Sequence, residues 1–255
     1  MTRFDDWCEE TEGTANGHDF TMLVTIDGGH EIGVDLVSKI VPTHYVSNEK
    51  YARMLKMLGK PSAAKYLQTK MPLKKRGRSG DLGEILAITY VKENTIWDQM
   101  VEKLRWSDHR EMPMRGDDLL AVGIVDGEIQ FLKGEAKSRA KLATKPITDA
   151  RESLEKDEGR PTPHALSFLS DRLAEEGRHD ISDRINSAQF RDGIALKNLT
   201  QMIFTFSGNN PKAFLVKDLN SYSGDVDQFS IGLRVPEHQK FIHDVYSKVI
   251  DDGDA

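Results

Sequence analysis

Short apolar runs, several of them alternating with polar residues, mark the segments that we expect to be strands. Asp126-Gly127 separates two of these runs, and Asp27-Gly28-Gly29 separates two others. An Asp-Gly pair between apolar runs is a strong hairpin signal, so we predict a hairpin at each position. The strands expected from this pattern are Phe20–Ile26, Ile32–Val41, Leu119–Val125, Glu128–Lys137, Ala213–Val216 and Phe229–Val235.

Other segments repeat their apolar residues at helical spacing. Asn48–Gln68 carries such a stripe, but Gly59-Lys60-Pro61 interrupts it and indicates two helices. Asp81–Glu93 begins with Asp81 and Glu84 at the spacing of a capping box. We expect further helices over most of Thr148–Phe206, with a break at Arg160–Pro163, and over Pro236–Ile250. The chain is therefore predicted to be a mixed α/β protein.

Composition narrows the possible classes of protein. The 255 residues are 38% hydrophobic and 30% charged, which provides for a core and a well-solvated surface. No apolar run approaches the ~18–20 residues that cross a bilayer, so we expect no membrane span. The acidic first residues lack the apolar stretch of a secretory signal. Cys8 is the single cysteine and rules out an internal disulfide and a cysteine-based zinc site, so we expect a cytoplasmic protein.

A basic segment divides the chain. Lys70–Arg78 carries five positive charges and no negative charge, and the composition changes on either side of it. We place a boundary here, between an N-terminal α+β subdomain, residues 1–78, and a larger part, residues 79–255. The segment is interpreted either as a solvated linker or as a contact for nucleic-acid phosphates.

The hairpin at Asp126-Gly127 predicts a cluster of charged side chains. With a two-residue turn, Asp118 faces Glu135 on the same side of the sheet, and Lys137 shares that side two residues further on. Asp117 would point to the opposite side, so Asp118 is the better candidate. A one-residue bulge would reverse that choice.

Two neighbouring carboxylates repel each other, and burial makes their ionisation still less favourable. A cation between Asp118 and Glu135 would remove this cost, and an oxygen-ligand pocket of this kind suits Mg²⁺. Lys137 would then orient a water molecule or a phosphate, which fits phosphodiester hydrolysis. The alternative is a surface ion pair between Glu135 and Lys137, with Asp118 merely ending a strand.

Asp118 before an apolar strand, followed by a turn and Glu135-Ala136-Lys137, resembles the PD-(D/E)xK nuclease superfamily. The resemblance implies a restriction-endonuclease-like core, in which helices flank a small mixed sheet. It also implies that Asp118, Glu135 and the Ala136 carbonyl bind Mg²⁺, or Mn²⁺ in its place, and that Lys137 is catalytic. Glu84 lies where many members place an additional acidic residue that is catalytic and binds metal, although it also fits the capping box with Asp81. The sequence lacks the proline of the motif before Asp118.

A narrower resemblance links residues 79–150 to the nuclease subunit of the bacterial Hachiman anti-phage defence system. It rests on the order of four motifs, which are Ser79–Glu93, Arg105-Trp106-Ser107, Arg115-Gly116-Asp117-Asp118-Leu119-Leu120 and Gly134-Glu135-Ala136-Lys137-Ser138. This resemblance implies a partner helicase of superfamily 2 that controls the nuclease, and a DNA substrate cut with little sequence preference. We predict that residues 1–78 form the partner-binding region, because they are apolar-patterned and lie outside the catalytic motifs.

The net charge of −6 argues against a wholly basic DNA-binding surface, but the positive charges are clustered. Lys133–Lys145 holds five cationic residues and one acidic residue. We predict that this segment and Lys70–Arg78 form a local phosphate-binding groove. Its candidate residues are Lys74, Lys75, Arg76, Arg78, Arg139 and Lys141.

Two alternatives stay open at this point. One is a catalytically silent nucleic-acid-binding adaptor of the helicase. The other is a junction resolvase or repair nuclease that acts without a dedicated partner. The sequence contains no phosphate-binding loop of the Gly-x-x-x-x-Gly-Lys-Ser/Thr type, so we assign any ATP use to a partner.

Overall fold

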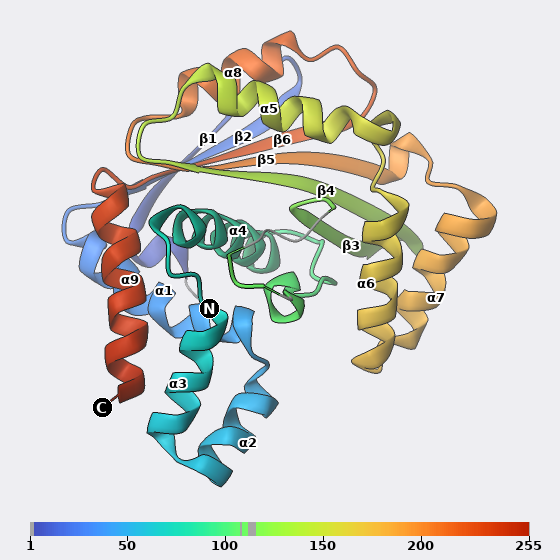
Figure 1. Cartoon of the computed structure of the whole chain (residues 1–255). Helices are drawn as coiled ribbons and strands as arrows, with labels where there is room; N and C mark the ends of the chain where they lie inside the picture. Colours follow the sequence, from blue (N-terminus) through green and yellow to red (C-terminus); the bar gives the residue numbers. More distant parts are fainter. Residues whose placement is uncertain (1–2, 108, 112–115, 255) are drawn as a thin grey trace.

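The computed structural model of the chain describes residues 3–107, 109–111 and 116–254, and a six-stranded sheet runs through it (Figure 1). The strand order is β1-β2-β6-β5-β4-β3. An antiparallel hairpin forms each edge, and the strands between them pair in parallel. The strands are β1 Cys8–Ala15, β2 His18–Thr25, β3 Leu119–Val125, β4 Glu128–Arg139, β5 Leu199–Ser207 and β6 Asp227–Arg234.

Helices cover both faces of this sheet. α5 and α8 lie on one face, α4 with α1 and α9 lies on the other, and α6 and α7 pack together near β3 (Figure 1). The helices are α1 Gly29–Tyr45, α2 Asn48–Leu58, α3 Lys60–Lys70, α4 Lys75–Asn94, α5 Thr144–Glu155, α6 Pro163–Glu175, α7 His179–Ser187, α8 Lys212–Ser221 and α9 His238–Asp254. The predicted mixed α/β class is confirmed.

The main core lies between the sheet and the helices α1, α4 and α9. Trp7 is fully buried there and stacks on Phe241 at a centroid distance of 5.4 Å. A smaller apolar cluster joins α5 and α8 to the other face, and a third joins α6 and α7 to β3 and β4. In the described part of the chain, no helix is long and apolar enough to cross a membrane.

The N-terminal hairpin is shifted from its predicted position. Its turn is Asn16-Gly17, with positive φ at both residues, and its first strand is β1, which precedes the predicted strands. The predicted strand Ile32–Val41 is wrong, because these residues lie in helix α1. Its buried valines recur at helical spacing, and Gly28 turns the chain from strand to helix.

Two predictions for the C-terminal half of the chain are also wrong, whereas several other predicted elements agree with the structure. Residues 199–206 were expected to be helical but form β5, a central strand whose side chains are buried on both faces. A continuous apolar run is typical of such a strand. Ala213–Val216 was expected to be a strand but lies in α8, which buries Leu215 and Leu219 one turn apart. The break between α2 and α3, the hairpin of β3 and β4, the strand β6 and the helix α9 agree with expectation.

Helix α4 begins six residues earlier than predicted, at Lys75. The capping-box interpretation of Asp81 and Glu84 is therefore wrong, since both residues lie inside the helix. The basic residues from Lys75 to Arg78 form its first turn. The strands β1 and β2 of the N-terminal region belong to the same sheet as the strands of residues 79–255.

Candidate active site

The hairpin of β3 and β4 has the predicted register. Val125 pairs with Glu128 and Leu119 pairs with Gly134, around a turn in which Asp126 and Gly127 both have positive φ. Positive φ at both central residues is typical of the tight turn that Asp-Gly favours. The pairing with β3 ends at Gly134, whereas β4 continues to Arg139 beside β5. We call this stretch of β4, Glu135–Arg139, the open edge.

The carboxylate of Asp118 lies against the open edge. Its Oδ2 accepts a hydrogen bond from the N–H of Ala136 at 3.2 Å and lies 3.8 Å from Nζ of Lys137. Asp118 itself precedes the first residue of β3, so it is not the ladder partner of Glu135 that the simple register predicts. The structure still brings Asp118 beside the Glu135-Ala136-Lys137 segment.

Asp117 has a different environment. Its carboxylate accepts a hydrogen bond from the N–H of Thr162 at 3.0 Å and lies 3.7 Å from Nζ of Lys133. These contacts join the start of β3 to the segment that precedes α6. Asp118 is therefore the aspartate whose carboxylate contacts the Glu135-Ala136-Lys137 segment.

Glu135 is buried on the face of β4 that α5 covers. Its Oε2 accepts a hydrogen bond from Lys137 at 2.6 Å, and its Oε1 accepts one from Ser153 at 2.7 Å. Burial raises the pKa of Glu135, and the neighbouring charge of Asp118 raises it further, while Lys137 opposes this rise. The predicted ion pair between Glu135 and Lys137 is present, but it is buried and not on the surface.

Helix α4 covers the other face of the open edge. Ser79 and Ser138 form a hydrogen bond between their hydroxyls at 2.8 Å. A Cβ at Gly83 would lie 3.0 Å from Cβ of Ser138, so glycine permits the close approach of helix and strand at this point. The next residue of α4 is Glu84.

Glu84 is half-buried, and one of its carboxylate oxygens is buried and unsatisfied. Its Oε2 has no hydrogen-bond partner and lies 3.7 Å from Nζ of Lys103. Burial raises the pKa of Glu84, Lys103 opposes this rise, and Asp118, Asp81 and Glu135 add to it. Glu84 is therefore within electrostatic range of Asp118 and Glu135, and we refer to these three carboxylates as the cluster.

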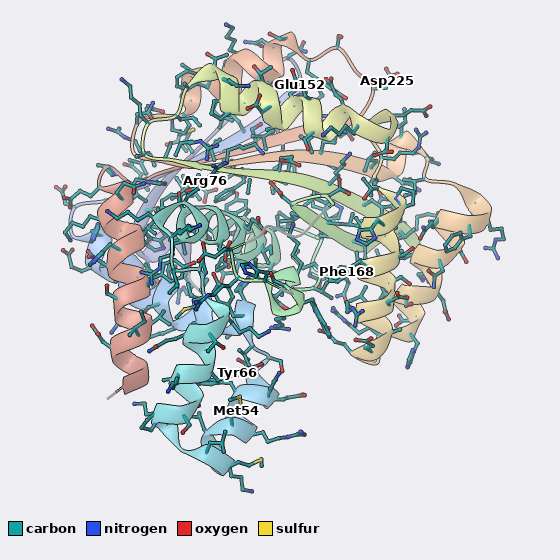
Figure 2. All side chains as sticks on the ribbon, viewed as in Figure 1. Met54, Tyr66, Arg76, Glu152, Phe168 and Asp225 are labelled. Atoms are coloured by element: carbon teal, nitrogen blue, oxygen red, sulfur yellow. The ribbon has the colours of Figure 1, made fainter. Side chains whose placement is uncertain are left out.

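Lys103 is a residue beside this cluster that the sequence did not reveal. It lies in the short 3-10 turn Lys103–Trp106 and donates a hydrogen bond to the carbonyl of Asp117 at 3.1 Å. A hollow beside it is lined by Lys103, Asp118, Leu119 and the α6 residues His164 and Phe168 (Phe168 is labelled in Figure 2). The sequence pattern of helices and strands does not single out Lys103. Its place in the site depends on contacts between segments that are distant along the chain.

The family is shown by sequence comparison. The HamA family model matches residues 1–249, almost the whole chain. The chain belongs to the HamA family. The Hachiman protein HamA of Bacillus cereus is 28% identical to it over 182 residues. The matched region covers 71% of this chain and 65% of that HamA protein, so the chain spans less than two thirds of the length of this relative.

In this HamA-family chain the two segments that carry the predicted basic residues are in contact with each other. The Ser79–Ser138 hydrogen bond joins the first turns of α4 to the end of β4, and Arg76, labelled in Figure 2, lies in the first of these turns. Lys74, Lys75, Arg76, Arg139 and Lys141 are exposed. Arg78 is half-buried, with its guanidinium over the ring of Tyr246 at 5.0 Å and its Nε bonded to the carbonyl of Pro72.

Lys133 does not belong to this basic surface. In the sequence Lys133 is one of the cationic residues of the Lys133–Lys145 segment. In the structure its side chain is buried and donates hydrogen bonds to three backbone carbonyls. The motif residue Arg115 lies outside the described residues.

Carboxylates are ligands of the type that Mg²⁺ prefers, but in this structure their orientation does not form a complete metal site. Among residues 3–107, 109–111 and 116–254, no three His, Cys, Asp or Glu side chains converge closely enough to hold a metal ion. Lys137 instead lies between Glu135 and Asp118. In this HamA-family site one oxygen of Glu84 is buried without a hydrogen-bond partner, and burial, with neighbouring acidic groups, raises the pKa values of Glu84 and Glu135. The donor set therefore fits a hard divalent cation.

Proposed function

We propose that this HamA-family chain is a metal-dependent DNA nuclease and a component of a Hachiman anti-phage defence system. The observation that supports the proposal best is the position of Asp118, Glu135 and Lys137 together at the open edge of β4, with Glu84 of α4 within electrostatic range of both carboxylates. Two carboxylates and a lysine at this hairpin, with a glutamate on a neighbouring helix, resemble the constellation of the PD-(D/E)xK superfamily, to which we assign the chain. The HamA family match supports the assignment to the Hachiman system.

The residues of the site have distinct proposed roles. Asp118 and Glu135 would hold the metal ion, with Glu84 as a further ligand from the α4 side. The N–H of Ala136 points to Asp118 at the open edge. Because N–H and C=O of one strand residue point the same way, its carbonyl is also directed there as a ligand. Mg²⁺, or Mn²⁺ in its place, would lower the pKa of a bound water and stabilise charge on the phosphate.

Lys137 would contact the reacting groups. Its ammonium lies 2.6 Å from Glu135 and 3.8 Å from Asp118, so it is held beside both candidate ligands. In this position it can orient the attacking water and neutralise the anionic phosphate. Lys103, on the other side of the cluster beside Glu84, would add a second positive charge next to the hollow that Asp118 lines.

DNA would bind along the exposed basic residues near the end of β4, which are Lys74, Lys75, Arg76, Arg139 and Lys141, with Arg78 beside them. Such contacts to phosphates set position and affinity without reading sequence. This agrees with a nuclease of little sequence preference.

The proposed partner is the superfamily-2 helicase of the same system, and α2 is its proposed contact. Helix α2 has no buried residue and projects with α3 away from the sheet (Figure 1). Its exposed apolar residues are Leu55, Met57 and Leu58. An exposed apolar patch of this kind is typical of a protein interface.

The nuclease proposal is tested with supercoiled plasmid DNA and purified protein, alone and with the helicase, in Mg²⁺, Mn²⁺ or EDTA. We expect Glu135→Gln and Lys137→Met to reduce cleavage by about 10²–10⁴-fold, because each removes a group that acts on the reacting atoms. DNA binding in EDTA should be retained. Glu152→Gln and Lys145→Met are the matched controls, since both side chains are exposed (Glu152 is labelled in Figure 2).

Equal metal-dependent cleavage by wild type and Glu135→Gln would overturn the nuclease proposal. If the wild type and the variants all bind DNA but none of them cleaves it under any condition, the chain is an adaptor of the helicase instead. The present position of Lys137 between the two carboxylates is the observation that favours this second candidate.

A further inference from the structure

We propose that Ser153 is a positioning residue for Glu135, an inference that rests on the proposed nuclease function. The two oxygens of the Glu135 carboxylate have different partners in the structure. Lys137 donates to Oε2 at 2.6 Å, and the hydroxyl of Ser153, on helix α5, donates to Oε1 at 2.7 Å. Glu135 is 5% exposed, so no bulk water competes for these positions.

The part of α5 that carries Ser153 is anchored to the strand that carries Glu135. The carbonyl of Leu154, the next residue, accepts hydrogen bonds from Nζ of Lys133 at 3.1 Å and from Nε2 of Gln201 at 3.0 Å. Lys133 and Glu135 are two residues apart on β4 and therefore lie on the same face. Ser153 is thus held at a fixed position relative to Glu135.

A second anchor restrains α5 one turn before Leu154. Arg151 donates to the carboxylate of Asp218 at 2.6 Å and to the amide oxygen of Gln228 at 2.6 Å. These partners lie on α8 and β6, so with the bonds from β4 and β5 the end of α5 is fixed to four other elements near Ser153.

This arrangement determines which oxygen of Glu135 is available to a metal ion. The terminal torsion of a glutamate side chain is broad, so a carboxylate with one partner can rotate. With Oε1 held by Ser153, Oε2 is directed toward Lys137 and Asp118. Outer-shell hydrogen bonds of this kind change metal affinity by about 10–100-fold when they are removed.

The test measures Mg²⁺ binding by isothermal titration calorimetry without DNA, and plasmid cleavage as a function of Mg²⁺ concentration. We expect Ser153→Ala to raise the Mg²⁺ Kd by about 10–100-fold, with cleavage largely recovered at high Mg²⁺. Ser153→Thr keeps the hydroxyl and should restore the wild-type Kd. Ser170→Ala is the control, because Ser170 is a buried serine of α6 bonded to Ser182 at 2.8 Å, away from Glu135.

Each outcome distinguishes the two proposals. If wild type binds Mg²⁺ and Ser153→Ala binds it with the same Kd, the inference about Ser153 is overturned while the nuclease stands. If wild type neither binds Mg²⁺ or Mn²⁺ nor cleaves DNA, the proposed function fails. Should Ser153→Ala not fold, as judged by its melting curve, Ser153→Cys decides, because a thiol fills the position but is a weak donor. An unchanged Kd in that variant also overturns the inference.

Discussion

Replacement of Lys133 by methionine offers a stringent test of the fold around the candidate site. The Lys133 side chain is fully buried, and its Nζ donates to the carbonyls of Leu154, Lys156 and Arg160 at 2.9–3.1 Å. The same ammonium lies 3.7 Å from the carboxylate of Asp117. Methionine keeps the length and the apolar stem of the side chain but supplies no donor and no charge.

The structure sets the size of the expected effect. Asp117 loses its buried counter-ion, a change that costs about 3–5 kcal/mol when one partner of such a pair is removed. Two circumstances reduce the cost: Asp117 keeps its hydrogen bond from Thr162, and the carbonyl of Leu154 keeps its bond from Gln201. The buried ammonium also no longer has to be desolvated. We therefore expect Lys133→Met to lower the free energy of unfolding by about 3 kcal/mol, at the lower end of that range.

Urea unfolding followed by tryptophan fluorescence measures this difference. Lys145→Met is the control, since the Lys145 side chain is 84% exposed and pairs with Asp149 one turn away on the surface of α5. Such an exposed change should alter stability by less than about 0.5 kcal/mol. Lys133→Met with unchanged stability and weakened, less salt-dependent DNA binding would refute this reasoning. Lys133 would then belong to the basic groove, as the sequence suggested.

Three further predictions concern the charged groups around the open edge. Burial raises the pKa of Asp81 to about 6 and also raises the pKa values of Glu84 and Glu135. The metal-free folded protein therefore binds more protons than the unfolded chain, so its melting temperature should fall between pH 5 and pH 8. Glu84→Gln should flatten that profile, and a flat wild-type profile would contradict the assignment. Lys103→Met should lower the melting temperature more at pH 8 than at pH 6, because it removes the positive charge nearest Glu84. An equal loss of melting temperature at both pH values would argue against the pairing of Lys103 with Glu84. Arg139→Ala with Lys141→Ala should reduce the slope of log K for DNA against log salt by about 0.9 for each phosphate that is no longer neutralised, whereas Lys39→Ala on α1 should not change it.

The part of the site that the sequence predicted depends on local geometry. The Asp126-Gly127 turn fixes the pairing of β3 with β4, so the positions of Glu135 and Lys137 follow from counting residues away from the turn. The structure places Asp118, rather than Asp117, beside Glu135-Ala136-Lys137, but the alternation of strand faces does not determine this. Asp118 lies before the strand and reaches the open edge from the loop, while Asp117 is bonded to Thr162.

The parts that the sequence missed depend on contacts between distant segments. The apolar run of β5 is compatible with a buried helix or a buried strand, and only its place between β4 and β6 decides between them. Lys103 and Ser153 come from elements whose own patterns say nothing about the site. Ser153 reaches Glu135 because α5 packs on β4, and Lys103 reaches Glu84 because the turn Lys103–Trp106 lies beside α4, an arrangement that no local signal predicts.

The charge around the open edge supports a divalent cation more strongly than any single residue does. Four carboxylates contribute: the charges of Asp118, Asp81 and Glu135 raise the pKa of Glu84, and the charge of Asp118 raises that of Glu135, both in addition to burial. The ammonium groups of Lys103 and Lys137 face them. With every group ionised, these groups together have two more negative than positive charges, which is the charge that one Mg²⁺ neutralises. Without a cation the protein can reduce this excess by protonating its buried carboxyls, and their raised pKa values are the expected consequence. The cation should therefore stabilise the protein most at high pH, where protonation no longer substitutes for it.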